Sequence, residues 1–237
     1  MKKEVVKPSN LIHIVHNMSL LQAQLWDFIL AQISPEELVA QEFHQIPIST
    51  IMRFLGNTRN SKHVKVILEE MAQISTHTLI NKSGSAEWGC FQLFSSARVV
   101  DNVLHFSCDK ITKDLMVDRI HYSRINLSMV RKFDCKYSLF LYELCCDYKN
   151  IGQTPHLKLG TFRQYMGVQD ECYQDFSLLN YYVIKKAIEE VNEKSDLFVN
   201  PVYQTDGRKI TEIKFEVLYK NGLNTSKFRR IKRAISR

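Results

Sequence analysis

Two segments that lie 111 positions apart follow the same plan: Ile46-Pro47-Ile48-Ser49-Thr50-Ile51-Met52-Arg53-Phe54-Leu55-Gly56 and Leu157-Lys158-Leu159-Gly160-Thr161-Phe162-Arg163-Gln164-Tyr165-Met166-Gly167. Each begins as a short extended piece and continues as a helix, with a threonine where the N-cap belongs. Apolar residues then recur at helical spacing, and a glycine stands where the helix must end. The repetition predicts that one structural module occurs twice.

Two further echoes occur in the same order along the chain. Leu68-Glu69-Glu70-Met71 is echoed by Ile188-Glu189-Glu190-Val191, and Leu25-Trp26-Asp27-Phe28 by Leu141-Tyr142-Glu143-Leu144. One match between short apolar words is weak, but three matches in one order favour an internal duplication. A chain of 237 residues is long enough for two domains of ordinary size.

Both halves are predicted to follow the order helix, strand, helix, turn, helix and hairpin. In the first half the predicted elements are helix 19–33, strand 46–48, helix 50–55, helix 61–74, a hairpin of 76–80 with 90–94, and an extended piece at 103–106. In the second half they are helix 136–148, strand 157–159, helix 161–166, helix 176–194, and a hairpin of 197–199 with 210–217 around Asp206-Gly207.

This order is typical of a winged-helix domain, so the predicted fold is α+β, with two tandem winged-helix domains related by internal duplication. The predicted divisions are a first winged-helix domain at 1–110, a partly helical connector at 111–134, a second winged-helix domain at 135–220 and a basic tail at 221–237.

The net charge of +7 is concentrated at the C-terminal end of the sequence. The last eleven residues hold no acid and contribute +6, through Lys227, Arg229, Arg230, Lys232, Arg233 and Arg237. Taken alone, such a tail is most simply a solvated end. Beside two winged helices, it predicts a polyanionic partner, because lysine and arginine neutralise phosphates.

Composition excludes several classes of protein. No apolar run approaches the roughly 20 residues of a membrane span, and His13, His16 and Asn17 interrupt the only candidate signal segment. The six cysteines have no C-x-x-C spacing, so we expect buried, reduced thiols, no metal site and no cofactor in a cytoplasmic protein.

In a winged helix the last helix before the wing enters the major groove of DNA. In the second half, Asn180 is a candidate for an adenine edge, Ser177 for a base or a phosphate, and Lys185 and Lys186 for the backbone. The wing tip adds Arg208 and Lys209, and the first half offers Arg59, Asn60, Lys62, His63 and Lys65. A solvated hairpin tip is an equally good interpretation of Arg208 and Lys209, and Asn180 is also compatible with an ordinary exposed helix position.

The sequence lacks residues that an enzyme acting on DNA would require. Tyr182-Val183-Ile184-Lys185 fits the Y-x-x-K spacing of rolling-circle nicking enzymes, but those also need an H-x-H metal pair, and no two of the eight histidines are two positions apart. No Walker loop is present either. The sequence therefore predicts that the protein is not an enzyme.

Two segments of the second half resemble the signatures of a known family. Lys136-Tyr137-Ser138-Leu139-Phe140-Leu141-Tyr142-Glu143-Leu144 is similar to a K-Y-[SA]-x-x-[LI]-Y-E-L signature, and 187–197 to an A-[LI]-x-E-I-N-x-K-[ST]-D pattern. Both belong to the iteron-binding plasmid replication initiators of the Rep 3 superfamily, which the chain resembles. Residues 159–167 are also similar. The resemblance extends from about Val5 to Leu218 and is weaker in the first half.

The resemblance implies a monomer that clamps directly repeated origin sites, or iterons, on double-stranded DNA. It also implies a dimer that represses its own gene at an inverted repeat. The second winged helix would supply most base readout, through the helix of Ser177, Asn180, Tyr181 and Lys185. The first would add DNA contacts in the monomer and the subunit interface in the dimer. A host replication initiator and the replicative helicase are the implied partners.

Two other functions remain compatible with the sequence. One is a winged-helix transcriptional regulator without a replication role, which would bind an inverted repeat in place of several direct repeats. The other is a protein-interaction module built on the same fold, against which the clustered basic tail argues.

Overall fold

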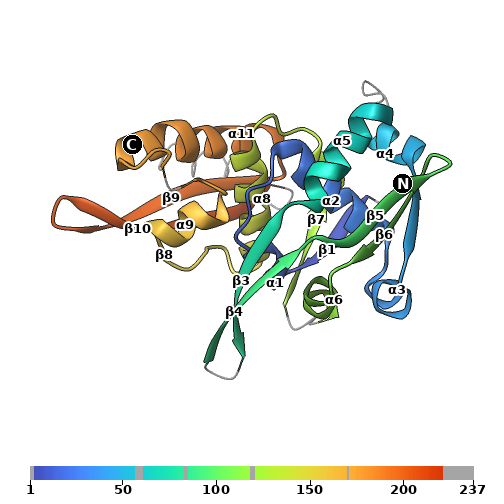
Figure 1. Ribbon diagram of the computed structural model, residues 1–237. Coiled ribbons are helices and arrows are strands. Elements are labelled where there is room, and N and C mark those ends of the chain that lie inside the picture. Colours follow the sequence, from blue (N-terminus) through green and yellow to red (C-terminus); the bar gives the residue numbers. More distant parts are fainter. Residues whose placement is uncertain (1–2, 57–60, 83–84, 118–120, 170, 221–237) are drawn as a thin grey trace. The chain divides into compact units, whose positions relative to one another are not determined.

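The computed structural model describes residues 3–56, 61–82, 85–117, 121–169 and 171–220. The chain divides into two compact units, Met1–Arg131 (unit 1) and Lys132–Arg237 (unit 2). The two units are described separately (Figure 1).

Unit 1 mixes helices with short antiparallel strands. Its elements are β1 (Glu4–Pro8), α1 (Ser9–Ile12), α2 (Leu20–Gln32), α3 (Pro35–Ala40), β2 (His44–Pro47), α4 (Ile48–Phe54), α5 (Ser61–Ala72), β3 (Ser75–Lys82), β4 (Ser85–Gln92), β5 (Phe94–Val100), β6 (Val103–Cys108), α6 (Lys110–Val117), β7 (Tyr122–Asn126) and α7 (Leu127–Val130).

Unit 2 is simpler. Its elements are α8 (Lys136–Tyr148), β8 (Leu157–Lys158), α9 (Leu159–Tyr165), α10 (Phe176–Leu179), the π-helical turn η1 (Asn180–Lys185), α11 (Lys186–Lys194), β9 (Leu197–Asp206) and β10 (Lys209–Tyr219). The helices α10, η1 and α11 follow one another without a break and form the single long helix that the sequence predicts at 176–194.

The two units contain the same three-stranded sheet. The strand orders are β2-β6-β5 in unit 1 and β8-β10-β9 in unit 2, so in each the short strand pairs with the last strand of a hairpin. The helix before the hairpin packs against its first strand, α5 against β5 and α11 against β9. The prediction of two winged-helix modules is therefore confirmed.

The strand–helix–glycine segments fold as a repeated unit, with one correction. Gly56 and Gly167 have φ of +90° and +58° and follow α4 and α9, where a left-handed residue ends a helix. The predicted threonine N-caps are wrong, because the helices already begin at Ile48 and Leu159 and no side chain caps them. The earlier start places buried Ile48 one turn before buried Ile51, which extends the apolar stripe.

The glutamates of the second echo occupy matching positions. Glu70 of α5 accepts a hydrogen bond of 2.9 Å from the side chain of Gln22, in the first turn of α2. Glu190 of α11 accepts the backbone N–H groups of Asp134 and Cys135, at 2.7 and 3.2 Å, just before α8 begins. In each unit the helix that bears the second echo therefore holds the start of the helix that bears the third: α5 holds α2, and α11 holds α8.

The third echo places a buried acid at matching positions of α2 and α8. Asp27 of α2 lies 3.0 Å from Lys7 of β1, and both side chains are almost fully buried. Glu143 is the buried counterpart in α8. A buried charge is strongly unfavourable without an oppositely charged partner. Lys7 and Asp27 therefore pair with each other, and the pair joins β1 to the core of unit 1.

The hairpin predicted from residues 76–80 and 90–94 forms as β3 and β4, but it is a separate two-stranded sheet. The hairpin that corresponds to β9–β10 is β5–β6, of which the sequence analysis recognised only 103–106. Asp101 and Asn102 turn this hairpin with φ of +50° and +59°. Two successive positive φ values fit the two-residue turn that matches strand twist.

The predicted connector at 111–134 is also corrected. Most of this segment belongs to unit 1, where α6, β7 and α7 lie, and the boundary between the units falls at 131/132. β7 pairs antiparallel with β1 over five residues, from Glu4 opposite Asn126 to Pro8 opposite Tyr122. The backbone hydrogen bonds of this ladder make the segment part of a domain.

Candidate nucleic-acid interface

The helix before the wing of unit 2 buries one face and exposes the other. Leu179, Val183, Ala187 and Val191 recur at helical spacing and are buried. Ile184 is also fully buried, beside Val183. Its burial coincides with the π-helical turn at Asn180–Lys185, where one additional residue is accommodated in the helix.

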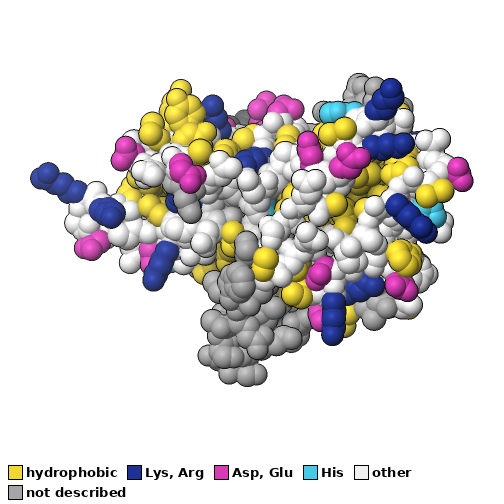
Figure 2. All heavy atoms as spheres, in the orientation of Figure 1, with side chains coloured by type: hydrophobic (Ala, Val, Ile, Leu, Met, Phe, Trp, Pro, Cys, Tyr) yellow, Lys and Arg dark blue, Asp and Glu magenta, His cyan; other side chains and the backbone are white. Residues whose placement is uncertain are grey.

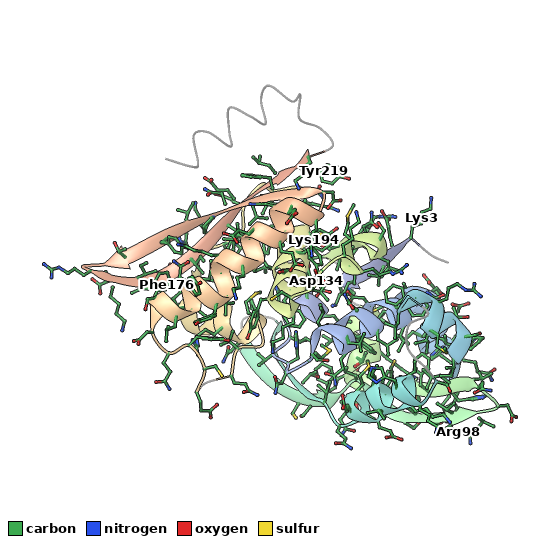
Figure 3. The ribbon with its side chains drawn as sticks, turned by 90° about the horizontal axis from the view of Figure 1, so that it is seen from above. Lys3, Arg98, Asp134, Phe176, Lys194 and Tyr219 are labelled. Carbon is green, nitrogen blue, oxygen red and sulfur yellow. The ribbon has the colours of Figure 1, made fainter. Side chains whose placement is uncertain are left out.

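The opposite face carries most of the predicted DNA-binding residues of unit 2. Ser177, Tyr181, Lys185 and Lys186 are exposed on it. Phe176 lies at the start of this run of helices and Lys194 at its end (Figure 3). Figure 2 shows hydrophobic side chains, a class that includes tyrosine, gathered over the helices of unit 2 with basic side chains close by. The face therefore combines aromatic surface with positive charge.

Asn180 differs from its neighbours on this helix. It is half-buried, and its side-chain oxygen accepts a hydrogen bond of 3.2 Å from the hydroxyl of Tyr203 on β9. Tyr203 in turn packs edge-on against Phe176, with ring centroids 5.5 Å apart, and burial raises its pKa. These contacts fix the orientation of the Asn180 amide and leave its NH₂ group to make the contact predicted with a base edge.

Three tyrosines form a cluster on the exposed side of the helix. The rings of Tyr173 and Tyr182 stack with centroids 5.3 Å apart, and Tyr181 meets Tyr182 edge-on at 4.9 Å. The ammonium of Lys186 lies over both Tyr181 and Tyr182, at 6.0 and 5.3 Å from their centroids. We call Tyr173, Tyr181 and Tyr182 the tyrosine face. Of these three tyrosines, only Tyr181 is among the DNA-binding residues predicted from sequence.

The loop before the helix is held in a defined shape by Arg163 of α9. Its guanidinium donates to the carbonyls of Tyr173, Cys172 and Gln169, at 2.8, 2.6 and 3.2 Å. Tyr173 itself has a φ of +50°, which is uncommon for a residue with a side chain. Arg163 thereby positions Tyr173 against Tyr182. Nothing in the local sequence signals this role, since it depends on a loop six to ten positions later.

The start of α8 lies near the same loop. Lys136 donates to the carbonyl of Gly167 at 3.1 Å, and burial lowers its pKa. Burial, followed by the influence of Tyr173, raises the pKa of Tyr137 to about 12. Both side chains therefore make contacts within unit 2, Lys136 with Gly167 and Tyr137 with Tyr173.

The wing of unit 2 ends in a tight turn that carries two of the predicted residues. Asp206 pairs with Lys209, so Gly207 and Arg208 form the loop, and Gly207 has a φ of +59°. Arg208 and Lys209 are exposed, and Figure 2 shows basic side chains at the tip of this hairpin. The predicted Asp-Gly hairpin is confirmed, and its tip is positively charged.

In unit 1 the corresponding helix is α5, on which Lys62 and Lys65 are exposed. Arg59 and Asn60 lie outside the described residues. A cleft of about 410 Å³ is lined by residues of α5, β5 and β6, among them Lys65, Glu69 and Arg98. Arg98 lies on β5 near the edge of unit 1 (Figure 3). Arg98 is not among the residues predicted from sequence, although the adjacent Asp101-Asn102 is a turn signal for this hairpin.

Several further predictions concern residues away from these faces. The tail residues Lys227, Arg229, Arg230, Lys232 and Arg233 lie outside the described residues. All six cysteines are free thiols: Cys108, Cys145 and Cys146 are buried as expected, but Cys90 and Cys172 are exposed. Among the described residues, no helix has the length and apolar character that crossing a membrane requires.

Two family models match the chain. The model described as Initiator Replication protein, WH1 matches residues 4–146, and the model described as Initiator Rep protein, WH2 matches residues 158–217. The WH1 match continues into α8, which packs against α11 and β9 of unit 2. The WH2 match begins in β8.

No curated protein sequence matches the chain. Among solved structures, domains 2 and 3 of RctB are similar with a TM-score of 0.44 and 9% sequence identity, over 88% of this chain and 81% of that one. A likeness this distant carries no weight beside the two family models. Those models cover both winged helices in order, and the chain belongs to the family of initiator Rep proteins, with a WH1 and a WH2 domain.

Proposed function

We propose that this DNA-binding replication initiator recognises directly repeated origin sites on double-stranded DNA as a monomer, with one winged helix in each of two major grooves. The observation that carries the proposal is that one chain holds two winged helices, each with an exposed face that bears lysines on the helix before its wing. A single chain with two such helices needs no partner subunit to span two helical turns.

We further propose that a dimer of the chain represses its own gene at an inverted repeat, and that the DNA-bound monomer engages a host initiator and the replicative helicase. The motifs at 136–144 and 187–197, which resemble the iteron-binding initiators, support both proposals. Since its partner is plasmid DNA, the protein would act in the bacterial cytoplasm.

We infer that the chain itself catalyses no reaction on DNA. The full sequence has neither an H-x-H pair beside Tyr182 nor a Walker loop. A supercoiled plasmid that carries the origin should therefore stay intact when incubated with the protein and Mg²⁺. The appearance of nicked circles that depends on Tyr182 would overturn this inference.

Footprinting on the DNA that flanks the gene tests the main proposal. We expect several protected direct repeats at a regular spacing of about two helical turns, and one chain per repeat by light scattering of the complex. Protection confined to one inverted repeat, with two chains bound, would favour the alternative of a simple transcriptional regulator.

The basic tail is proposed to contact phosphates without reading bases. Removal of residues 227–237 should weaken binding to origin and random DNA by the same factor and flatten the dependence of affinity on salt. A salt slope equal to that of the full chain would refute this role. A chain in which the six basic tail residues are replaced by glutamine separates the loss of charge from the loss of length.

A further inference from the structure

We propose that the tyrosine face of unit 2 reads the 5-methyl groups of thymines in the major groove and makes thymine a specificity-determining base of the bound site. The inference rests on the proposed function, because it assigns a base preference to the helix that the DNA-binding proposal places in the groove. It names what that helix recognises.

The helix has little capacity to read guanine. Residues 176–194 contain no arginine, and arginine or lysine makes the bidentate contact with guanine that is the commonest specific contact in the major groove. The ammonium of Lys186 lies over the rings of Tyr181 and Tyr182, which leaves Lys185 as the exposed lysine for that contact. The oxygen of Asn180 already accepts from Tyr203. Hydrogen-bond readout of guanine from this helix therefore rests on a single lysine.

Aromatic surface takes the place of these polar groups. Tyr181 and Tyr182 are 61% and 41% exposed, and Leu178 beside them is 44% exposed. An exposed apolar patch of this kind marks an interaction site. In the major groove the apolar feature available to such a patch is the thymine methyl group. Lys185 and Lys186 add the positive charge that distinguishes DNA from an apolar protein partner.

The structure holds the tyrosine face rigidly enough to discriminate. Tyr182 stacks on Tyr173, whose carbonyl accepts a hydrogen bond from Arg163, and Tyr181 abuts the edge of Tyr182. The π-helical turn contributes as well, because Val183 and Ile184 are both fully buried while the two preceding tyrosines stay outside. Single π-helical turns of this kind are frequent at functional sites.

The experiment uses the full chain and a duplex that this chain selects from a randomised library. Each thymine of the selected site is replaced in turn by deoxyuridine, which removes only the methyl group, and affinity is measured by fluorescence anisotropy. For the wild type we expect about fourfold weaker binding at one or two positions, equivalent to about 0.8 kcal/mol for a buried methyl-sized group. Tyr181→Ala should bind the thymine and deoxyuridine duplexes equally.

Two further variants serve as controls. Tyr181→Phe keeps the ring and should keep the methyl sensitivity. Tyr219→Ala removes an exposed tyrosine from the end of β10 that is remote from the wing tip and should leave the sensitivity intact. The deoxyuridine series on the wild type needs no variant, so a Tyr181→Ala chain that failed to fold would not prevent the test.

The outcomes separate the two proposals. If the wild type prefers its selected duplex to a scrambled one but ignores every deoxyuridine, the thymine inference is wrong and the proposed function stands. If selected and scrambled duplexes bind equally, the proposed function fails. If Tyr181→Ala weakens binding to single-stranded DNA alone, the face is a stacking platform and the thymine inference is overturned.

Discussion

In unit 1 the helix before the wing exposes lysines, His63 and Val66, whereas in unit 2 the corresponding helix exposes Tyr181 and Tyr182 with lysines beside them. The three-stranded sheet beside each of the two helices has the same strand order, although unit 1 inserts the β3–β4 hairpin after its helix. The plan of the fold therefore fixes where each helix is presented, while a few outward side chains determine what it contacts. Unit 1 is suited to phosphate contacts, and unit 2 also to base edges.

The two units also differ in how the first helix is held. Unit 1 uses the buried pair of Lys7 and Asp27 and an additional two-stranded sheet of β1 and β7. Unit 2 uses Glu190 and Lys194 near the surface, where Lys194 reaches Asp134 at 2.5 Å and Glu190 at 2.7 Å (Figure 3). Burial makes the first arrangement sensitive to the loss of one partner, and partial exposure makes the second tolerant.

The largest effect is expected from Asp27→Ala. It leaves the ammonium of Lys7 buried without its carboxylate, which costs about 3 to 5 kcal/mol. Both tryptophans, Trp26 and Trp88, lie in unit 1, so urea unfolding followed by tryptophan fluorescence reports on this unit. The double variant Lys7→Met with Asp27→Leu should recover most of the lost stability. An unfolding midpoint unchanged by Asp27→Ala would show that the pair does not hold β1 to the core.

The next effect concerns base readout. Asn180→Ala should weaken binding by about 1 to 3 kcal/mol at one base pair of the selected site and leave binding to random DNA nearly unchanged. Tyr203→Phe removes the hydroxyl that orients Asn180 and should relax specificity at the same base pair by a smaller amount. The matched change in unit 1, Lys62→Ala, should weaken both kinds of DNA alike. If Asn180→Ala weakened binding to the selected site and to random DNA equally, unit 2 would not read a base through Asn180, and the two units would not differ in this respect.

A smaller effect, with a pH dependence, is expected at Glu190. Burial acts to raise the pKa of Glu190, but hydrogen bonds from Lys194 and the backbone of Asp134 outweigh it, and the pKa falls below its usual value of 4.5. Because the folded-state pKa is the lower one, this stabilisation is present above about pH 4.5 and is lost as the pH falls through the folded-state pKa.

Glu190→Gln should therefore destabilise unit 2 by about 1 to 2 kcal/mol at pH 7, because a charge-assisted hydrogen bond to the backbone is lost, and by less in acid. Hydrogen exchange of the amides at the start of α8, measured at pH 7 and pH 4, reads this change directly. Glu189→Gln alters an exposed neighbour and serves as the control. Identical protection in Glu190→Gln and wild type would contradict the assigned role.

The smallest change in affinity is expected at the wing of unit 2. The double variant Arg208→Ala with Lys209→Ala should lower the slope of log affinity against log salt by about 2, without altering base preference. Lys62→Ala with Lys65→Ala is the matched pair in unit 1 and should lower the slope by a similar amount. A change in the preferred DNA sequence of the wing variant would show that the hairpin, and not the helix alone, contributes to base readout.

Local sequence patterns predicted the parts of the fold that depend on local physics. Apolar periodicity located the main helices, and the turn after Asp206 and the glycines after α4 and α9 were recognised by the backbone conformations they require. Pairing over long distances was missed. β1 finds its partner β7 more than 100 positions later, and nothing in residues 4–8 identifies it.

For the candidate site, the sequence predicted which helix faces DNA but not which side chains form its exposed face. Ile184 is buried within the π-helical turn at Asn180–Lys185, and nothing in the sequence pattern of this helix indicates that turn. Tyr173 joins the tyrosine face through a loop whose shape depends on Arg163. Asn180 was chosen for the correct helix, but its bond to Tyr203 comes from tertiary structure.

The position of α8 has a practical consequence for dissecting the protein. Sequence profiles assign most of this helix to WH1, yet Tyr142 donates a hydrogen bond to Asp196 and packs against Phe133, both within unit 2. A gene cut between the two profiles would leave the C-terminal piece without the helix that completes its interior, and that piece should aggregate. The cut that yields a soluble half-protein for crystallisation or NMR falls at residue 131, ahead of α8.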